Sequence, residues 1–484
     1  MQSTYQESLV QNQSLAEQNQ KLTDQVQGLV EQNRKLTEEN KQLKARIREL
    51  EATVAMLLER LGINSKNSSK PPSSDMKPSS KGGAKRVKKK RAKGFFRQRL
   101  PKEEVNDTIS CELEACPHCQ SKDLVKRGKP AIFQTIEIKK SPLWVTDYER
   151  QRYYCKKCKR KSHAHLPKGV GADCFGPRLR AAMGMLTGVF HISRRRTAEL
   201  LDTLLGLKIS VGSISMNEER VSKALDGTYK EIQDTARDRP VAKHADETGW
   251  RLQGQRYWVW LLTTEKEAYF RLDQSRSKEA ASKLLGSCKG SLVTDRLASY
   301  NVFKGSRQYC LAHALREATC MSERAGIDGE IGEDLRDDIF WTLKAHREYR
   351  EGCLSRSAWR QRLRRYEKGM EETLLFGAAA GKVGKTVSTC RSLLKDFSRL
   401  WTFAYSKGME PTNNLAERDL RRLVIWRKIS FGSQSDRGCR FVERIMSVST
   451  TLRKRGHNAF DFIYQAMQAQ LGLAPIPILP EPGH

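Results

Sequence analysis

The feature that most constrains the fold of this chain is a leucine at every seventh position near its start. Three asparagines, two valines and an isoleucine recur four residues after these leucines, a combination that selects parallel two-stranded coiled coils. A single solvated helix is the alternative, but such regularity would serve no purpose without a partner helix. We therefore expect residues 1–62 to form a leucine zipper that makes a homodimer or a higher assembly. The leucine column is Leu15, Leu22, Leu29, Leu36, Leu43, Leu50 and Leu57.

The next segment joins a Ser/Pro-rich stretch to a dense run of cations. Residues 64–75 read N-S-K-N-S-S-K-P-P-S-S-D, and Lys77 to Lys102 contains twelve Lys or Arg and no acid. Neither stretch can build a core, so residues 63–104 are expected to be a disordered linker. Basic-zipper transcription factors place their basic region ahead of the zipper, so this order argues against that class. The cations predicted to contact DNA phosphates are Lys88, Lys89, Lys90 and Arg91.

The whole chain is strongly basic, which indicates a polyanionic partner. Its 484 residues include 88 Lys and Arg against 56 Asp and Glu, for a formal charge of +32. Phosphate neutralisation by Lys and Arg releases counterions, so a nucleic acid is the expected partner. No apolar run approaches the ~18 residues of a membrane-spanning helix, and the polar start lacks a signal peptide. We expect a cytoplasmic protein that is not associated with a membrane.

Two C-x-x-C pairs follow the linker and predict a zinc site. Four thiolates hold Zn²⁺ tetrahedrally in a closed, structural site, and the residues between the pairs alternate as ribbon strands do. Coincidental free thiols are the alternative interpretation. We expect a zinc-binding domain over residues 105–168. The predicted ligands are Cys116, Cys119, Cys155 and Cys158, with Cys111, His118, His163 and His165 as substitutes.

From Pro177 to about Ala224, apolar residues recur with helical spacing. S-R-R-R-T-A-E-L-L-D-T-L-L-G followed by S-V-G-S-I-S-M-N-E-E-R-V resembles a helix-turn-helix. A purely structural helical hairpin fits nearly as well, but three arginines at the start of the first helix favour DNA contact. We expect residues 169–238 to form a helical, helix-turn-helix-like DNA-binding segment. The three arginines are Arg194, Arg195 and Arg196.

Beyond Arg239-Pro240 the pattern changes from helix to strand. Strands are expected at V-A-K-H-A-D-E-T, at Y-W-V-W-L-L-T-T after a Q-G-Q-R turn, and at A-Y-F-R-L-D. A helix from Lys278 to Leu285 and a fourth strand, S-L-V-T-D, complete an order that resembles the opening of an RNase H-like sheet. In that topology the first and fourth strands are neighbours, so Asp246 and Asp295 could share one site. Paired carboxylates suit Mg²⁺, although a turn-capping aspartate is the alternative for each.

A third acid should come from a later helix packed on the sheet, and Glu417 in P-T-N-N-L-A-E-R-D-L-R-R is the candidate. Pro411 breaks the chain, and Asn413 or Asn414 can cap a new helix. Asn414 with Glu417 also fits a capping box, and Glu417 with Arg421 fits a solvated ion pair. Spacing alone leaves these alternatives open.

Further cations follow Glu417 and suit the clamping of DNA strands beside a carboxylate site. The C-x-x-H formed by Cys310 and His313 is expected to orient or pack near the site, since two ligands alone do not make a zinc site. Gly384-Lys385-Thr386 lacks the earlier glycine of a phosphate-binding loop, so ATP is not implied. The cations after Glu417 are Arg421, Arg422, Arg427 and Lys428.

Taken together, these segments resemble the transposases of the bacterial insertion sequence 66 family. The zipper, N-S-S-K-P-P-S-S-D, the paired C-x-x-C, H-A-D-E-T, V-T-D-R-L-A-S-Y, C-L-A-H-A-L-R and N-N-L-A-E-R-D-L-R carry the resemblance over nearly the whole chain. It implies that Asp246, Asp295 and Glu417 are the catalytic acids of a DDE triad. One departure is Arg296, which follows Asp295 where that motif usually reads D-G-Y. This affects the turn more than the metal ligand.

The resemblance also implies a location, the bacterial cytoplasm in association with the nucleoid, a partner, double-stranded DNA, and a reaction. Two Mg²⁺ or Mn²⁺ ions held by the triad would support cleavage at transposon ends and strand transfer into target DNA, and accessory proteins could take part. The rival class is a zinc-dependent DNA-binding regulator on a catalytically dead nuclease-like scaffold. A nuclease without strand transfer is a third possibility, and it would leave no joined product.

The predicted architecture is multidomain. An N-terminal α coiled coil, a small zinc-ribbon-like domain and a helix-turn-helix-like segment precede an α/β RNase H-like catalytic domain with an α-helical insertion. The 121 residues between Asp295 and Glu417 exceed what an RNase H core needs. The core is therefore expected at 239–320 and 409–470, the helical insertion at 321–408, and an extended, disordered tail at 471–484.

Overall fold

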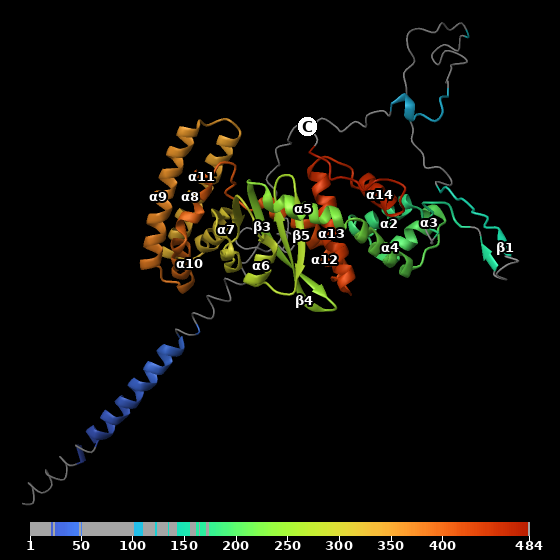
Figure 1. Cartoon of the computed structure of the whole chain (residues 1–484). Coiled ribbons are helices and arrows are strands. Elements are labelled where there is room, and N and C mark those ends of the chain that lie inside the picture. Colours follow the sequence, from blue (N-terminus) through green and yellow to red (C-terminus); the bar gives the residue numbers. More distant parts are fainter. Residues whose placement is uncertain are drawn as a thin grey trace, which may run out of the picture. The chain divides into compact units, whose positions relative to one another are not determined.

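The computed structural model, whose elements are labelled in Figure 1, divides into two compact units. One unit comprises Met1–Met76 and Arg307–Thr412, and the other Lys77–Ser306 and Asn413–His484. Within the residues that the structure describes, no helix is both long and apolar enough to cross a membrane. The described residues are 21–22, 25–47, 50, 101–109, 122, 134, 143–154, 161–163, 165–170 and 174–482.

Residues 25–47 form one helix, as the leucine column predicts. Leu29, Leu36 and Leu43 on this helix are 59%, 55% and 61% exposed. A regular column of exposed leucines on an otherwise polar helix is a surface that a partner helix can bury. Leu15 and Leu57, at the two ends of the column, lie outside the described residues, and the coiled coil stays a prediction.

Only parts of the expected zinc-binding segment are described. They include an antiparallel pair, β1 (Arg152–Tyr154) and β2 (Lys161–His163), and the short helix η2 (Lys102–Glu104) lies just before the segment, at the end of the expected linker. A short antiparallel pair is compatible with a ribbon. The four predicted zinc ligands and the run Lys88–Arg91 lie outside the described residues, so zinc stays a prediction.

Four helices precede the large sheet, as the helical spacing predicts. Two of them begin at serine caps: Ser193 accepts a hydrogen bond from the backbone N–H of Arg196, and Ser210 from that of Ser213. The first of these capped helices ends at Gly206, whose φ of 65° is left-handed. All four belong to the same compact unit as the sheet. The helices are α2 (Pro177–Gly188), α3 (Arg194–Leu205), α4 (Val211–Ala224) and α5 (Asp226–Asp238).

The mixed sheet has five strands, four of which lie in this unit in the order β5-β4-β3-β6. The first three strands along the chain pair antiparallel, and the fourth pairs parallel with the first. The sequence predicted this neighbouring of the first and fourth strands, and the arrangement is compatible with an α/β catalytic domain. The elements are β3 (Ala242–Leu252), β4 (Gln255–Thr263), β5 (Ala268–Asp273), α6 (Lys278–Leu285) and β6 (Ser291–Thr294).

The hairpin between β3 and β4 is tighter than the expected Q-G-Q-R turn. Leu252 pairs with Gln255, which leaves only Gln253 and Gly254 in the loop. Both have positive φ, 50° and 79°, as a two-residue turn matched to the strand twist requires. The short segment η3 (Ala298–Val302) follows β6.

Three helices complete the unit: α12 (Asn414–Ser430), α13 (Asp436–Lys454) and α14 (Ala459–Gln470). Side chains on one face of α13 accept hydrogen bonds from alternate backbone N–H groups of β5. Such bonds satisfy donors that an edge strand would otherwise expose. The pairs are Glu443 with Leu272 at 2.7 Å, Ser447 with Phe270 at 2.9 Å and Thr451 with Ala268 at 3.0 Å.

The C-terminal tail differs from the expected disordered segment. Arg455 donates a hydrogen bond to the carbonyl of Pro480 at 2.7 Å, and the Leu479 side chain is 5% exposed. Burial of this leucine and the bond from α13's end hold the tail against the unit, which the Pro-rich composition did not reveal.

The other unit contains Arg307–Thr412, which is helix-rich, and the range expected for the helical insertion, 321–408, lies within it. It begins with the short strand β7 (Arg307–Tyr309). Its two long helices, α8 and α9, lie side by side (Figure 1). The helices are α7 (Leu311–Ser322), α8 (Ile327–Arg350), α9 (Arg356–Ala380), α10 (Gly384–Lys395), η4 (Phe397–Leu400) and α11 (Thr402–Tyr405).

Candidate active site

The three predicted acids lie in one unit, on elements that pack together. Asp246 is on β3, and Asp295 directly follows β6, which runs parallel beside β3. Glu417 lies in the first turn of α12, which packs against β3. The strand and helix positions expected from the sequence are therefore those found in the structure.

The carboxylates interact electrostatically. Burial raises the pKa of Asp246 well above its usual range, and the charges of Glu247, Asp295 and Glu417 raise this pKa further. The Glu247 backbone N–H, which donates to Asp246 Oδ1 at 2.9 Å, acts in the opposite direction. A buried group of like charges is stable only when a proton or a cation compensates it.

The donor set fits a hard divalent ion such as Mg²⁺ or Mn²⁺. These ions prefer carboxylate oxygen and commonly take one or two protein carboxylates, with water and substrate phosphates as further ligands. Among the described residues, no three His, Cys, Asp or Glu side chains converge closely enough to surround one ion. Carboxylates such as Asp246, Asp295 and Glu417 could share such an ion with water and substrate phosphates.

Asp295 also caps its own turn, because its Oδ1 accepts a hydrogen bond from the Leu297 backbone N–H at 2.9 Å. The turn-capping alternative from the sequence is therefore present in the structure. The Asp295 carboxylate still acts on its acidic neighbours, because its charge raises the pKa of Asp246 and of Glu247. The capping bond instead fixes one carboxylate oxygen in place.

Glu247, the neighbour of Asp246, is held by a network that the sequence did not reveal. Arg276 donates to Glu247 Oε1 from Nε at 2.8 Å and from Nη2 at 2.5 Å, and the Tyr300 hydroxyl donates to Oε2 at 2.7 Å. Burial raises the pKa of Glu247, as does Asp295, while Tyr300 and Arg276 lower it. The tyrosine of V-T-D-R-L-A-S-Y was the one available signal for this network.

Helix α12 is attached to β3 near both of its ends. Asn413 precedes the helix and makes no side-chain cap; its Nδ2 instead donates to the Ala245 carbonyl at 2.9 Å. The helix begins at Asn414, so Asn414 lies inside it and is not the N-cap that a capping box with Glu417 requires. Towards the other end, Arg427 donates to the Gly249 carbonyl at 2.6 Å and to Thr248 Oγ1 at 3.2 Å.

A comparison with known families identifies the chain. A family model described as "Transposase IS66 family" matches residues 173–440, more than half of the chain, and this range includes all three acids. The chain belongs to the IS66 transposase family. In this IS66 family member, residues 3–99, which cover most of the predicted zipper and linker, match a second model, a family of unknown function designated DUF6444. No curated protein matches the chain.

The arginines predicted to contact DNA in this IS66 transposase differ in their exposure: some are bonded to other protein groups, and others are exposed. Arg194 donates twice to Glu218 Oε2, at 2.9 and 2.6 Å, and so links α3 to α4. Arg195 and Arg196 are exposed. Of the later set, Arg427 is bound to β3, whereas Arg421, Arg422 and Lys428 are exposed on α12.

Cys310 and His313 lie at the start of α7, in the unit that contains Arg307–Thr412, the helical unit. The three acids lie in the unit made of Lys77–Ser306 and Asn413–His484, the sheet unit. The Cys310 side chain is 2% exposed and immediately precedes the helix. Their expected role beside the acids stays a prediction.

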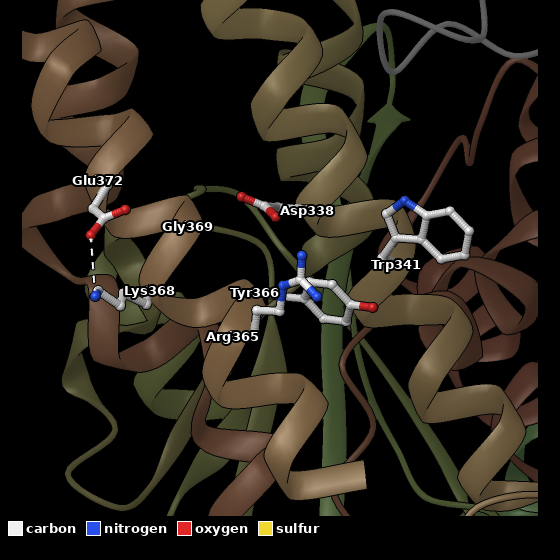
Figure 2. Close-up of a pocket in the computed structure, with 7 residues that line it drawn as sticks. All are labelled: Asp338, Trp341, Arg365, Tyr366, Lys368, Gly369 and Glu372. Atoms are coloured by element: carbon white, nitrogen blue, oxygen red, sulfur yellow. Dashed lines mark ion pairs between the residues drawn. The ribbon is translucent and has the colours of Figure 1, made fainter. Parts of the chain in front are cut away.

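A cavity of about 590 Å³ lies between α8 and α9 of the helical unit (Figure 2). Its lining mixes acids and bases, and Lys368 lies 3.7 Å from Glu372. Burial, together with Asp334 and Asp337, raises the pKa of Asp338 to about 6. None of the residues predicted for catalysis or metal binding lines this cavity. The lining residues are Asp338, Trp341, Arg365, Tyr366, Lys368, Gly369 and Glu372.

Proposed function

We propose that this IS66 family member is a DDE transposase that cuts at transposon ends and joins the freed 3′ ends to target DNA. The supporting observation is that Asp295 and Glu417, in the same unit, lie close enough to Asp246 for their charges to raise its pKa. A buried carboxylate whose proton affinity is raised by acids from two other elements lies in a site that favours a cation. Family membership agrees with a role in transposition.

Divalent ions bound by these carboxylates would lower the pKa of the attacking water or hydroxyl and stabilise the leaving oxygen of an in-line displacement. The residues of the chain contribute ligation and positioning. Asp246 is fixed by the Glu247 N–H and Asp295 by the Leu297 N–H, so each presents a pre-oriented carboxylate. No covalent protein intermediate is needed, which distinguishes this reaction from that of Ser or Tyr recombinases.

Exposed cations on two parts of the sheet unit are suited to holding DNA phosphates. Arg195 and Arg196 extend from α3, and Arg421, Arg422 and Lys428 from α12, the helix that also carries Glu417. The basic run Lys88–Arg91 would add a tether without sequence preference. Arg194 and Arg427 would support these contacts indirectly, through their bonds to Glu218 and to β3.

The N-terminal elements would organise the assembly. A parallel zipper over residues 1–62 would hold two catalytic units at high effective concentration, as synapsis of two transposon ends requires. Zn²⁺ bound by Cys116, Cys119, Cys155 and Cys158 would fold the segment between linker and helices.

The experiment is incubation of the purified protein with labelled transposon-end DNA and Mg²⁺ or Mn²⁺, with cleaved and joined products measured separately. Glu417→Gln should abolish both products while DNA affinity stays nearly unchanged, because the substitution removes one carboxylate from the site only. Glu410→Gln, in the helical unit, is the control and should leave both products at the wild-type level. Cleavage without joining would support a nuclease, and neither product would support a regulator on a dead scaffold.

A further inference from the structure

A buried asparagine joins the strand of the first acid to the helix of the third. Asn413 is fully buried, directly before α12 and four residues before Glu417. Its Nδ2 donates to the carbonyl of Ala245, the residue before Asp246, at 2.9 Å. Its Oδ1 lies 3.2 Å from Nδ1 of His244, which is also buried on β3.

The chemistry of these groups fixes the orientation of the asparagine. A backbone carbonyl can only accept, so the amide NH₂ of Asn413 must face Ala245. Its carbonyl oxygen then faces His244, and Nδ1 of His244 must carry a hydrogen and donate. One amide is thereby held at both of its polar atoms by two consecutive residues of β3.

This arrangement is not explained by capping of the helix. The ordinary use of an asparagine at this position is to accept a bond from the first turn of the helix, and Asn413 makes no such bond. A buried polar side chain that loses its partners is costly, so the pair specifies one docking position of α12 on β3. That position sets where Glu417 lies relative to Asp246.

We propose that Asn413 and His244 are positioning residues that set the separation of the Asp246 and Glu417 carboxylates and thereby the affinity of this site for a divalent ion. The inference rests on the proposed function, because it takes the acids as a metal site. Groups that orient metal ligands without touching the metal commonly change metal affinity 10- to 100-fold when they are removed.

The experiment measures Mn²⁺ binding to the full-length protein without DNA, by electron paramagnetic resonance of the free ion. Binding lost in Asp246→Asn defines the site. Asn413→Ala should raise the Kd of that site about 10- to 100-fold. Asn414→Ala, one position along and exposed, is the matched control and should stay within about twofold.

The conservative variant separates positioning from simple loss of packing. His244→Gln retains an N–H donor that can reach Asn413, so its Kd should lie closer to that of the wild type than the Kd of His244→Ala. An Asn413→Ala protein that folds and binds Mn²⁺ with the wild-type Kd would overturn the proposal. If Asn413→Ala does not fold, equal wild-type Kd values for both His244 variants would overturn it.

The two proposals fail separately. If the Kd is raised in Asn413→Ala but the wild type does not cleave DNA, the positioning role of Asn413 and His244 is retained and the transposase reaction is rejected. Cleavage by the wild type with an unchanged Kd in Asn413→Ala would do the reverse. If no Mn²⁺ binding depends on Asp246, both the metal site and the positioning role of Asn413 and His244 are rejected.

Discussion

Tyr300 donates its phenolic hydrogen to Glu247 Oε2 at 2.7 Å and so ties the segment after Asp295 to the strand that carries Asp246. Both side chains are buried, and Glu247 is also bound by Arg276. The segment after Asp295 is thus connected to the strand of Asp246 through Glu247, and this bond leaves the carboxylates of Asp246 and Asp295 uninvolved.

Tyr300→Phe should lower the free energy of unfolding by about 2 kcal/mol, because a hydrogen bond to a charged group contributes about 1.5–3 kcal/mol. Glu247 would keep its partner Arg276, so the fold should persist. Urea unfolding measures the change. Tyr257→Phe, at a partly buried tyrosine of β4, is the control and should change stability by less than about 0.5 kcal/mol.

Asp246→Asn should stabilise the metal-free protein near neutral pH. The folded pKa of Asp246 is raised, so the native state loses stability as pH rises above the unfolded value near 3.8. A neutral amide removes this cost, and a tenfold difference in proton affinity between the two states corresponds to about 1.4 kcal/mol. Thermal unfolding in chelator at several pH values should show a gain that disappears in acid. A variant less stable than the wild type at neutral pH would contradict this.

His191 should make the stability of the sheet unit fall as pH is lowered from about 6.5 to 4. Its ring stacks on Trp426 at 4.6 Å, and burial, followed by the charge of Arg422, lowers its pKa to about 4. In this window the unfolded state binds a proton that the folded state excludes, at a cost of up to about 3 kcal/mol. His191→Asn tolerates the positive φ of 58° and should show a weaker pH dependence. Unfolding curves for the two proteins that stay parallel through this window would refute the assignment.

Replacing Leu29, Leu36 and Leu43 with Ala should turn a dimer into a monomer. These side chains are more than half exposed on the isolated helix and can be buried only by a partner. Light scattering measures the mass, and paired-end cleavage should fall much more than binding of a single end. A protein lacking residues 1–62 that remains dimeric would show that the zipper serves another partner.

Cys116→Ser or chelation should unfold the segment between about residues 111 and 165 and weaken DNA binding, because the metal supplies folding free energy to a segment with little core. Circular dichroism and a binding titration measure the two effects. Elemental analysis that finds no zinc in protein purified under reducing conditions would rule out the site.

The elements around the acids could be predicted because their signals are local. Alternating apolar residues mark β3 to β5, and Pro411 followed by two asparagines marks the start of α12. The contacts between these elements could not be predicted in the same way. His244 and Asn413 are 169 residues apart, and Glu247 and Tyr300 are 53 apart, so only the folded path of the chain brings them together.

The assignment of single cations to DNA was limited for a similar reason. Arg427 and Lys428 are neighbours in sequence, but the face of α12 that packs on β3 includes the first and not the second. Arg194 likewise differs from Arg195 and Arg196 only through Glu218, which is 24 residues away on α4. Charge patterns identify a basic surface but not which members remain available to a ligand.

The hydrogen bonds from the backbone of β5 to side chains of α13 have a consequence for synthesis on the ribosome. The N–H groups of residues 268–272 are complete long before Glu443, Ser447 and Thr451 have been translated, because about 170 residues separate the two segments. At ~5–20 residues per second this delay is on the order of 10–30 s. During it the nascent sheet has an open edge, which can pair with other chains. Premature termination anywhere in the helical unit would leave that edge open permanently, so truncated products should aggregate while the full-length chain remains protected.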